Sequence, residues 1–149
     1  MLDHRLLPQD PLPDATLAVM ELPLSADQRT VLRGRRRTAC GREVLLQLPR
    51  ERALAPGDRL TNSLWQVHVL VTAAPEELLR VEAATPLALL EAAYHLGNRH
   101  VALELHEHEL LLHNDSVLAA MLKGRGLKLT RCCGPFRPEG GAYLAHQHA

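Results

Sequence analysis

Short apolar runs alternate with turn residues along the first half of the chain. Three runs rich in Val and Leu, at residues 17–22, 43–48 and 65–73, are separated by proline and glycine. In the third run Val67, Val69 and Val71 alternate with other residues, which predicts a half-buried strand. His68 then falls on the less buried face of that strand. The pattern as a whole predicts a small all-β domain over residues 1–74.

The second half alternates between strand and helix periodicity. Strand patterns occur at residues 78–84, 101–105, 110–112 and 127–136, and helical spacing occurs at Leu87, Leu90 and Tyr94 and again at Leu118, Met121 and Leu122. Thr85 and Asp115 can cap the two helices, and Gly97 can take the left-handed conformation that ends the first. The order β-α-β-β-α-β over residues 75–143 is that of a ferredoxin-like domain. We therefore predict an α+β protein: the N-terminal all-β domain, the ferredoxin-like domain and a short tail at residues 144–149.

Charge and composition exclude several classes of protein. The 17 Lys and Arg balance the 17 Asp and Glu, whereas broad nucleic-acid binding normally needs a strongly basic domain. No apolar run approaches the roughly 20 residues of a membrane span, and the first residues do not resemble a signal peptide. The three cysteines are too few for a disulfide framework, which favours the reducing cytoplasm. We expect neither a nucleic-acid nor a membrane partner.

One basic cluster lies in the first half, at residues 33–37, with the sequence Arg-Gly-Arg-Arg-Arg. Edge strands often carry charge that discourages pairing, so a solvated edge strand or turn is one interpretation. A contact surface for an acidic partner protein is the other.

Histidine is the unusual component of the composition. Two of the nine histidines lie in residues 1–75 and seven follow, namely His95, His100, His106, His108, His113, His146 and His148. Neutral imidazole suits Ni²⁺, Cu²⁺ and Zn²⁺, unlike the oxygen ligands that Mg²⁺ and Ca²⁺ prefer. The second half is therefore the candidate for metal chemistry. The chain has no H-E-x-x-H helix, G-x-S-x-G elbow or phosphate-binding glycine loop, so we do not expect an enzyme.

Residues 94–101, Tyr-His-Leu-Gly-Asn-Arg-His-Val, resemble the signature of the UreE family, the urease accessory nickel chaperones. Two further stretches are similar to family patterns. These are Gly-Arg-Glu-Val at 41–44 with Leu-Pro-Arg at 48–50, and Pro-Phe-Arg-Pro-Glu-Gly-Gly-Ala-Tyr at 135–143. The resemblance covers nearly the whole chain.

The resemblance implies that residues 1–74 bind partner polypeptide and that residues 75–143 bind metal and form a homodimer. It implies that His100 and its symmetry mate share one nickel ion, and that His146 and His148 supply further ligands. Ni²⁺ is then cargo, and Cu²⁺ or Zn²⁺ can bind in vitro. The implied partners are the urease accessory GTPase, the other urease maturation proteins and the urease apoprotein complex, in the cytoplasm.

The remaining histidines have more than one interpretation. His95 is in the last turn of a predicted helix, where it is either structural or a support for a ligand. His106 and His108 can chelate a secondary ion from one face of an extended chain, or lie in an exposed polar turn. His113 precedes Asn-Asp-Ser, where several relatives carry a His-Asp-His pair, so that peripheral site does not transfer.

Cys132 and Cys133 are adjacent in a predicted strand and therefore point to opposite faces. The two thiols cannot easily bind one metal together, and we expect at least one to be a small core residue.

The leading hypothesis is a non-catalytic nickel metallochaperone that delivers Ni²⁺ during urease metallocentre assembly. An alternative is an interaction adaptor or protein-folding chaperone that acts through the N-terminal β domain, with incidental histidines. A further alternative is a small zinc hydrolase that holds one ion between His100 and the tail.

Overall fold

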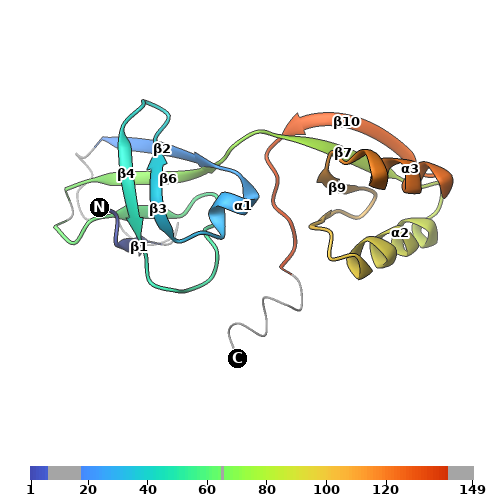
Figure 1. Cartoon of the computed structure of the whole chain (residues 1–149), viewed down its shortest axis with the longest axis horizontal. Helices are drawn as coiled ribbons and strands as arrows, with labels where there is room; N and C mark the ends of the chain where they lie inside the picture. Colours follow the sequence, from blue (N-terminus) through green and yellow to red (C-terminus); the bar gives the residue numbers. More distant parts are fainter. Residues whose placement is uncertain (7–17, 65, 141–149) are drawn as a thin grey trace. The chain divides into compact units, whose positions relative to one another are not determined.

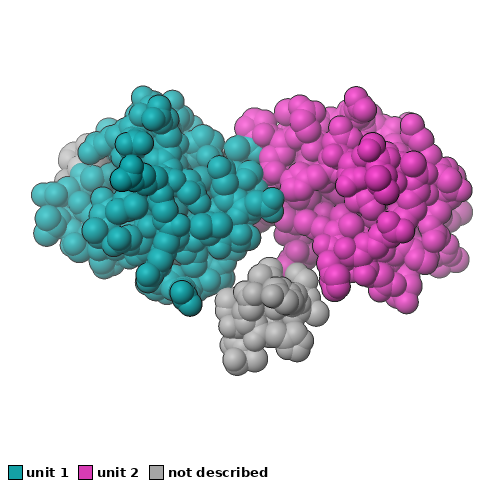
Figure 2. All heavy atoms as spheres, viewed as in Figure 1, with its two compact units in different colours: residues 1–74 teal, residues 75–149 magenta. Residues whose placement is uncertain are grey.

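The computed structural model describes residues 1–6, 18–64 and 66–140. The chain divides into two compact units, Met1–Ala74 and Pro75–Ala149, which we call unit 1 and unit 2 (Figures 1 and 2). No helix of the described residues is long and apolar enough to cross a membrane.

Unit 1 is built mainly of strands. They are β1 (His4–Leu6), β2 (Val19–Leu24), β3 (Arg33–Arg37), β4 (Glu43–Gln47), β5 (Arg59–Thr61) and β6 (His68–Ala73). Four of them form a sheet of order β1-β5-β6-β2, in which β2 and β6 are parallel and the other pairs are antiparallel. The strands β3 and β4 form a separate antiparallel pair. Buried leucine and valine side chains from both sheets make one core.

A short helix, α1 (Ala26–Arg29), interrupts the strands of unit 1. The Ser25 side chain accepts from the Gln28 backbone N–H, and the Gln28 side chain accepts from the Ser25 N–H, which is a capping box. The guanidinium of Arg29 is buried and donates to the Leu24 carbonyl at 3.0 Å. Unit 1 is therefore not purely β, and the Ser-x-x-Gln spacing was the signal for this helix.

His68 is buried, with 4% of its surface exposed, so its predicted place on a less buried face is wrong. β6 is an inner strand between β5 and β2, and His68 and Val69 at its start are both buried, so burial does not alternate there. Burial lowers the pKa of His68, and the nearby charge of Arg59 lowers the same pKa further.

Unit 2 combines one sheet with two helices. In chain order its elements are β7 (Glu76–Glu82), α2 (Pro86–Asn98), β8 (Glu104–Leu105), β9 (Leu110–His113), α3 (Ser116–Gly124) and β10 (Lys128–Gly134). The sheet is antiparallel with the order β10-β7-β9-β8, and its core packs against α2 and α3. The described chain thus combines helices and strands, which confirms the predicted α+β composition.

Different segments pack on the two faces of the sheet in unit 2: the helices α2 and α3 on one, and the segment that follows β10 on the other. Leu79 and Val81 of β7 point to the helices and belong to the core. Leu78 and its cross-strand neighbour His113 point to the other face, where Phe136 is fully buried and its ring centroid lies 4.6 Å from that of His113. We call residues 135–140 the strap, because this segment follows β10 and is hydrogen-bonded to Leu103 and Glu104 at the start of β8.

Two hydrogen bonds hold the strap at β8. The backbone N–H of Glu139 donates to the Leu103 carbonyl at 2.7 Å. The N–H of Arg137 donates to Oε1 of Glu104 at 2.6 Å. The last strand was predicted to continue to residue 136, but it ends at Gly134 because the chain turns there into the strap.

Candidate metal centre

The turn after α2 places His100. Thr85 caps the start of this helix by accepting from the Ala88 N–H at 3.1 Å, as predicted. At the other end, the His100 N–H donates to the Gly97 carbonyl at 3.0 Å, and the Val101 N–H donates to the Leu96 carbonyl at 3.1 Å. These two bonds form a Schellman motif, with His100 in the position just after the C-cap.

His100 has a left-handed backbone with φ of 57°, the one non-glycine residue with positive φ in the described chain. We expected Gly97 to take this conformation, and that prediction is wrong, because α2 continues through Asn98. Left-handed backbone costs a residue with a Cβ about 1 kcal/mol, which is why glycine is usual at this position. The chain thus accepts strain at the residue that the sequence singled out as a metal ligand.

The side chain of His100 is exposed to solvent. Within the residues that the structure describes, no group of three or more His, Cys, Asp or Glu side chains could hold a metal ion. His146 and His148 lie outside the described residues. One chain, as far as it is described, therefore offers His100 as a single ligand and not a closed site.

The α2 helix carries large apolar side chains on an exposed face. Leu87, Leu90 and Tyr94 are 63%, 67% and 66% exposed. The buried face of the helix consists of Leu89, Ala92 and Leu96. We call Leu87, Leu90 and Tyr94 the α2 stripe. They run along the helix toward its C-terminal end, and His100 lies just after that end. Exposed apolar patches of this kind mark interaction surfaces.

His95 lies in the last turn of α2 and is half-buried. Its ring meets that of Tyr94 edge-on, with centroids 5.4 Å apart. His95 is thus in contact with one end of the α2 stripe.

His106 and His108 lie in the exposed turn between β8 and β9. Nε2 of His106 is 2.5 Å from Oε2 of Glu104, and Nε2 of His108 is 3.8 Å from Oε1 of Glu107. The two imidazole rings pair with different carboxylates and not with one shared partner. This favours an exposed polar turn over a site in which His106 and His108 chelate one ion.

His113 of β9 contacts Glu76 at the start of β7 and Phe136 of the strap. Its Nε2 lies 2.7 Å from Oε1 of Glu76, and its ring packs against Phe136. This arrangement gives His113 a structural role under the strap.

The expectation that a cysteine of β10 belongs to the core is wrong. Cys132 is half-buried and Cys133 is exposed. The physical reason is that β10 is an edge strand of the sheet, so one side of the strand has no neighbour.

Glu104 was not singled out from the sequence, yet its two carboxylate oxygens join the strap to the β8–β9 turn. Its partners are a ring two residues away and a backbone N–H 33 residues away. No local pattern could have indicated the second of these contacts.

Comparisons with known proteins give the same family for the second half of the chain and for its whole length. Residues 76–149 match the family model described as UreE urease accessory protein, C-terminal domain. The protein named Urease accessory protein UreE from Synechococcus sp. (strain CC9311) is 85% identical over 149 residues, which is 100% of this chain and 96% of that protein. The protein of the same name from Parasynechococcus marenigrum (strain WH8102) is 62% identical over 99% of this chain and 95% of its own length. That from Thermosynechococcus vestitus is 49% identical over 91% and 94%.

Proposed function

The chain belongs to the UreE family of urease accessory proteins, and from that premise we propose that it is a nickel metallochaperone that delivers Ni²⁺ during urease metallocentre assembly. Family membership confirms the resemblance carried by residues 94–101. It also makes the chain an accessory protein of urease maturation and not an enzyme.

The observation that carries the proposal is the strained, exposed His100 at the end of the α2 stripe. A single imidazole is a poor metal site, but a twofold axis supplies a second one without further sequence. We propose that the α2 stripes of two chains form the homodimer interface, and that His100 and its symmetry mate bind one Ni²⁺ there.

The strap supports a role for the tail. Its Glu139 is bonded to Leu103, which lies three residues after His100 in the chain. The seven residues from Glu139 to His146 can span up to about 25 Å, so the tail is long enough to reach the His100 side of unit 2. We propose His146 and His148 as additional ligands on this ground.

A carrier must release its metal as well as bind it. Two imidazoles leave coordination positions open for water or for the tail, whereas closed four-ligand sites are structural. Nitrogen ligands also bind Cu²⁺ and Zn²⁺, and the general affinity order favours Cu²⁺ over Ni²⁺. Delivery of nickel would therefore depend on supply and on partners. We propose the accessory GTPase, the other maturation proteins and the urease apoprotein complex, in the cytoplasm.

Equilibrium dialysis with Ni²⁺ tests the proposal. Wild-type protein should bind nickel stoichiometrically per dimer, and His100→Ala should lose the interfacial ion. His108→Ala is the matched control, because its side chain is 85% exposed and belongs to a turn. Unchanged nickel binding in His100→Ala would contradict the proposal. Absence of stoichiometric binding in the wild type would favour an adaptor with incidental histidines.

A further inference from the structure

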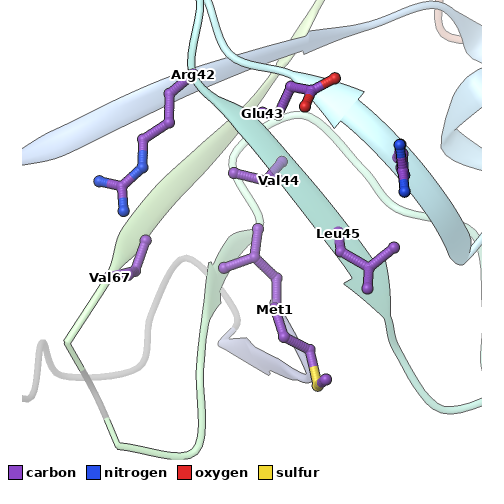
Figure 3. Close-up of a pocket in the computed structure, with 8 residues that line it drawn as sticks. Met1, Arg42, Glu43, Val44, Leu45 and Val67 are labelled. Atoms are coloured by element: carbon purple, nitrogen blue, oxygen red, sulfur yellow. The ribbon is translucent and has the colours of Figure 1, made fainter.

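Unit 1 has a groove of about 300 Å³ beside β4, where Met1, Leu45 and Arg42 lie around one hollow (Figure 3). The basic cluster at residues 33–37 forms β3, which pairs only with β4 in the described chain, so the edge-strand interpretation is confirmed. Both features belong to the half that the family resemblance already assigns to partner polypeptide. A second groove lies in unit 2, and no histidine lines it, so it is not part of the proposed nickel site.

The second groove lies between α3 and the edge strand β10 and has a volume of about 410 Å³. Four residues spaced three and four apart line it from one face of α3, namely Ser116, Ala119, Ala120 and Lys123. Leu129 and Arg131 line it from β10, on the side of the sheet that the helices cover. Because Ala119 and Ala120 are short, α3 leaves this part of β10 open. We call this the α3–β10 groove.

The two edges of the sheet in unit 2 differ. The edge strand β8 has two residues, and the strap bonds to Leu103 and Glu104 there. The edge strand β10 has seven residues in unbroken register with β7, and it contains no proline. Among the described residues, the backbone groups of β10 hydrogen-bond only to β7. A long edge strand of this kind can pair with a further extended segment.

The surface around the α3–β10 groove is basic. Residues 116–134 contain no Asp or Glu and carry four exposed cations, namely Lys123, Arg125, Lys128 and Arg131. No carboxylate of the described residues lies within 4.0 Å of the charged nitrogens of these four side chains. The whole chain has no net charge, so this excess of positive charge is local. These cations are available to an external anion.

We propose that the α3–β10 groove binds an extended acidic segment of a partner protein, which adds to the sheet as a strand beside β10. Backbone hydrogen bonds to the open edge supply affinity. Alternate side chains of the added strand point to the helix side, where carboxylates meet Lys123 and Arg131. The site needs no metal and is independent of the proposed nickel ligands.

Charge and backbone chemistry together select this occupant. A second copy of this chain would set two basic β10 strands side by side, and like charges opposite each other destabilise a strand pair. A nucleic acid also carries negative charge, but it has no strand to add to the open edge. An acidic polypeptide satisfies both the cations and the unpaired backbone groups.

Fluorescence anisotropy tests the proposal on the metal-free full chain, with the N-terminally labelled peptide Thr-Glu-Val-Glu-Val-Glu-Thr-amide. Wild-type protein should bind it, with affinity that falls as salt rises. Two further peptides are N-methylated, one at both valines and the other at all the glutamates. Alternate residues of a strand present their N–H groups to opposite sides, so at least one methylated peptide should bind about tenfold more weakly. Hydrogen exchange followed by NMR should slow at amides of residues 128–134 when the peptide binds.

The double variant Lys123→Glu/Arg131→Glu should bind the peptide at least about tenfold more weakly, because attraction is replaced by repulsion. Both side chains are exposed, and circular dichroism should remain that of the wild type. Arg50→Glu/Arg137→Glu is the matched control, because these two exposed arginines do not line the groove and the change in net charge is the same. Its peptide affinity should fall less than about twofold.

Absence of peptide binding to the wild type, equal loss in the two double variants, or full affinity for both methylated peptides would overturn the proposal. Unchanged hydrogen exchange in β10, or tighter binding of a single-stranded oligonucleotide than of the peptide, would also contradict it. Nickel dialysis of Lys123→Glu/Arg131→Glu should match the wild type. Failure of this proposal therefore leaves the nickel site standing, and loss of nickel binding in His100→Ala does not depend on the groove.

Discussion

His100 and Gly126 occupy the same position at the ends of the two helices of unit 2. Each follows the C-cap residue, and their φ values are 57° and 80°. The N–H of Gly126 donates to the Lys123 carbonyl at 2.9 Å, just as that of His100 donates to Gly97 at 3.0 Å. After α3, where no ligand is proposed, the left-handed position is occupied by glycine. After α2 the same position is occupied by His100, the proposed metal ligand.

Replacing His100 by glycine should separate stability from metal binding. We expect His100→Gly to raise the free energy of unfolding by about 1 kcal/mol, because glycine adopts positive φ without strain. The same variant should lose the interfacial nickel ion. Urea denaturation of the metal-free protein and nickel dialysis measure the two effects.

Gly126→Ala is the control for this comparison. Nothing lies within 4 Å of a Cβ placed at Gly126, so its cost is conformational and not steric. The variant should be less stable than the wild type by about 1 kcal/mol and should bind nickel normally. A His100→Gly protein that is less stable than the wild type would show that the left-handed turn is not strained.

The α2 stripe should control dimerisation. Leu90→Glu places a charge on a side chain that is 67% exposed in the chain alone, so the fold should persist while the homodimer dissociates at micromolar concentration. Sedimentation velocity measures the oligomeric state. Val117→Glu, on α3 and 69% exposed, is the matched control and should leave the dimer intact. Dimers of unchanged stability in Leu90→Glu would place the interface elsewhere.

Local signals predicted the elements of unit 2, because each lies in a short stretch of sequence. Thr85 and Asp115 cap the helices as expected, since their side chains accept from backbone N–H groups two or three residues away. The buried face of α2 was harder to predict, because apolar residues occur on both sides of the helix. Periodicity indicates a helix, but Leu89 and Leu90 are equally apolar and only one of them is buried.

Features that depend on distant contacts could not be predicted. The strap is held by the Glu139–Leu103 bond, between residues 36 positions apart. The left-handed turn at His100 was assigned to Gly97 because glycine is the usual residue there, and no local pattern reveals the exception. At the candidate site, family resemblance identified His100, whereas the structure supplied its conformation and the exposed stripe beside it.

Unit 1 should lose stability in mild acid through His68. Its pKa is lowered from the model-compound value of 6.5, mainly by burial and then by Arg59, so the folded state favours the neutral ring. The stabilisation is complete above pH 6.5 and declines as the pH falls toward the lowered pKa, because the unfolded chain takes up the proton first.

Urea midpoints of the wild type and His68→Leu between pH 7.5 and 5 measure this contribution. The difference between the two proteins removes the effect of the other histidines. We expect the wild type to lose more stability than the variant over this range. Parallel pH profiles would show that His68 does not contribute.

Glu104 should anchor the strap. Glu104→Ala removes the acceptor of the Arg137 N–H, and the amide should exchange its hydrogen about tenfold faster as the strap opens locally. Glu104→Gln keeps an acceptor oxygen and should exchange at nearly the wild-type rate. Hydrogen exchange followed by NMR distinguishes the two variants. Equal rates in all three proteins would mean that the Leu103 contact alone holds the strap.

Removal of residues 144–149 should weaken nickel binding and leave the dimer intact. The truncated chain retains His100, the α2 stripe and the whole strap, so the interfacial ion should remain bound, with fewer ligands and a lower affinity. Dialysis gives the affinity, and sedimentation gives the oligomeric state. The double variant His146→Ala/His148→Ala in the full-length chain should match the truncation, because the effect is attributed to the imidazoles and not to tail length. If the truncation weakens binding and the double variant does not, the tail contributes through groups other than its histidines.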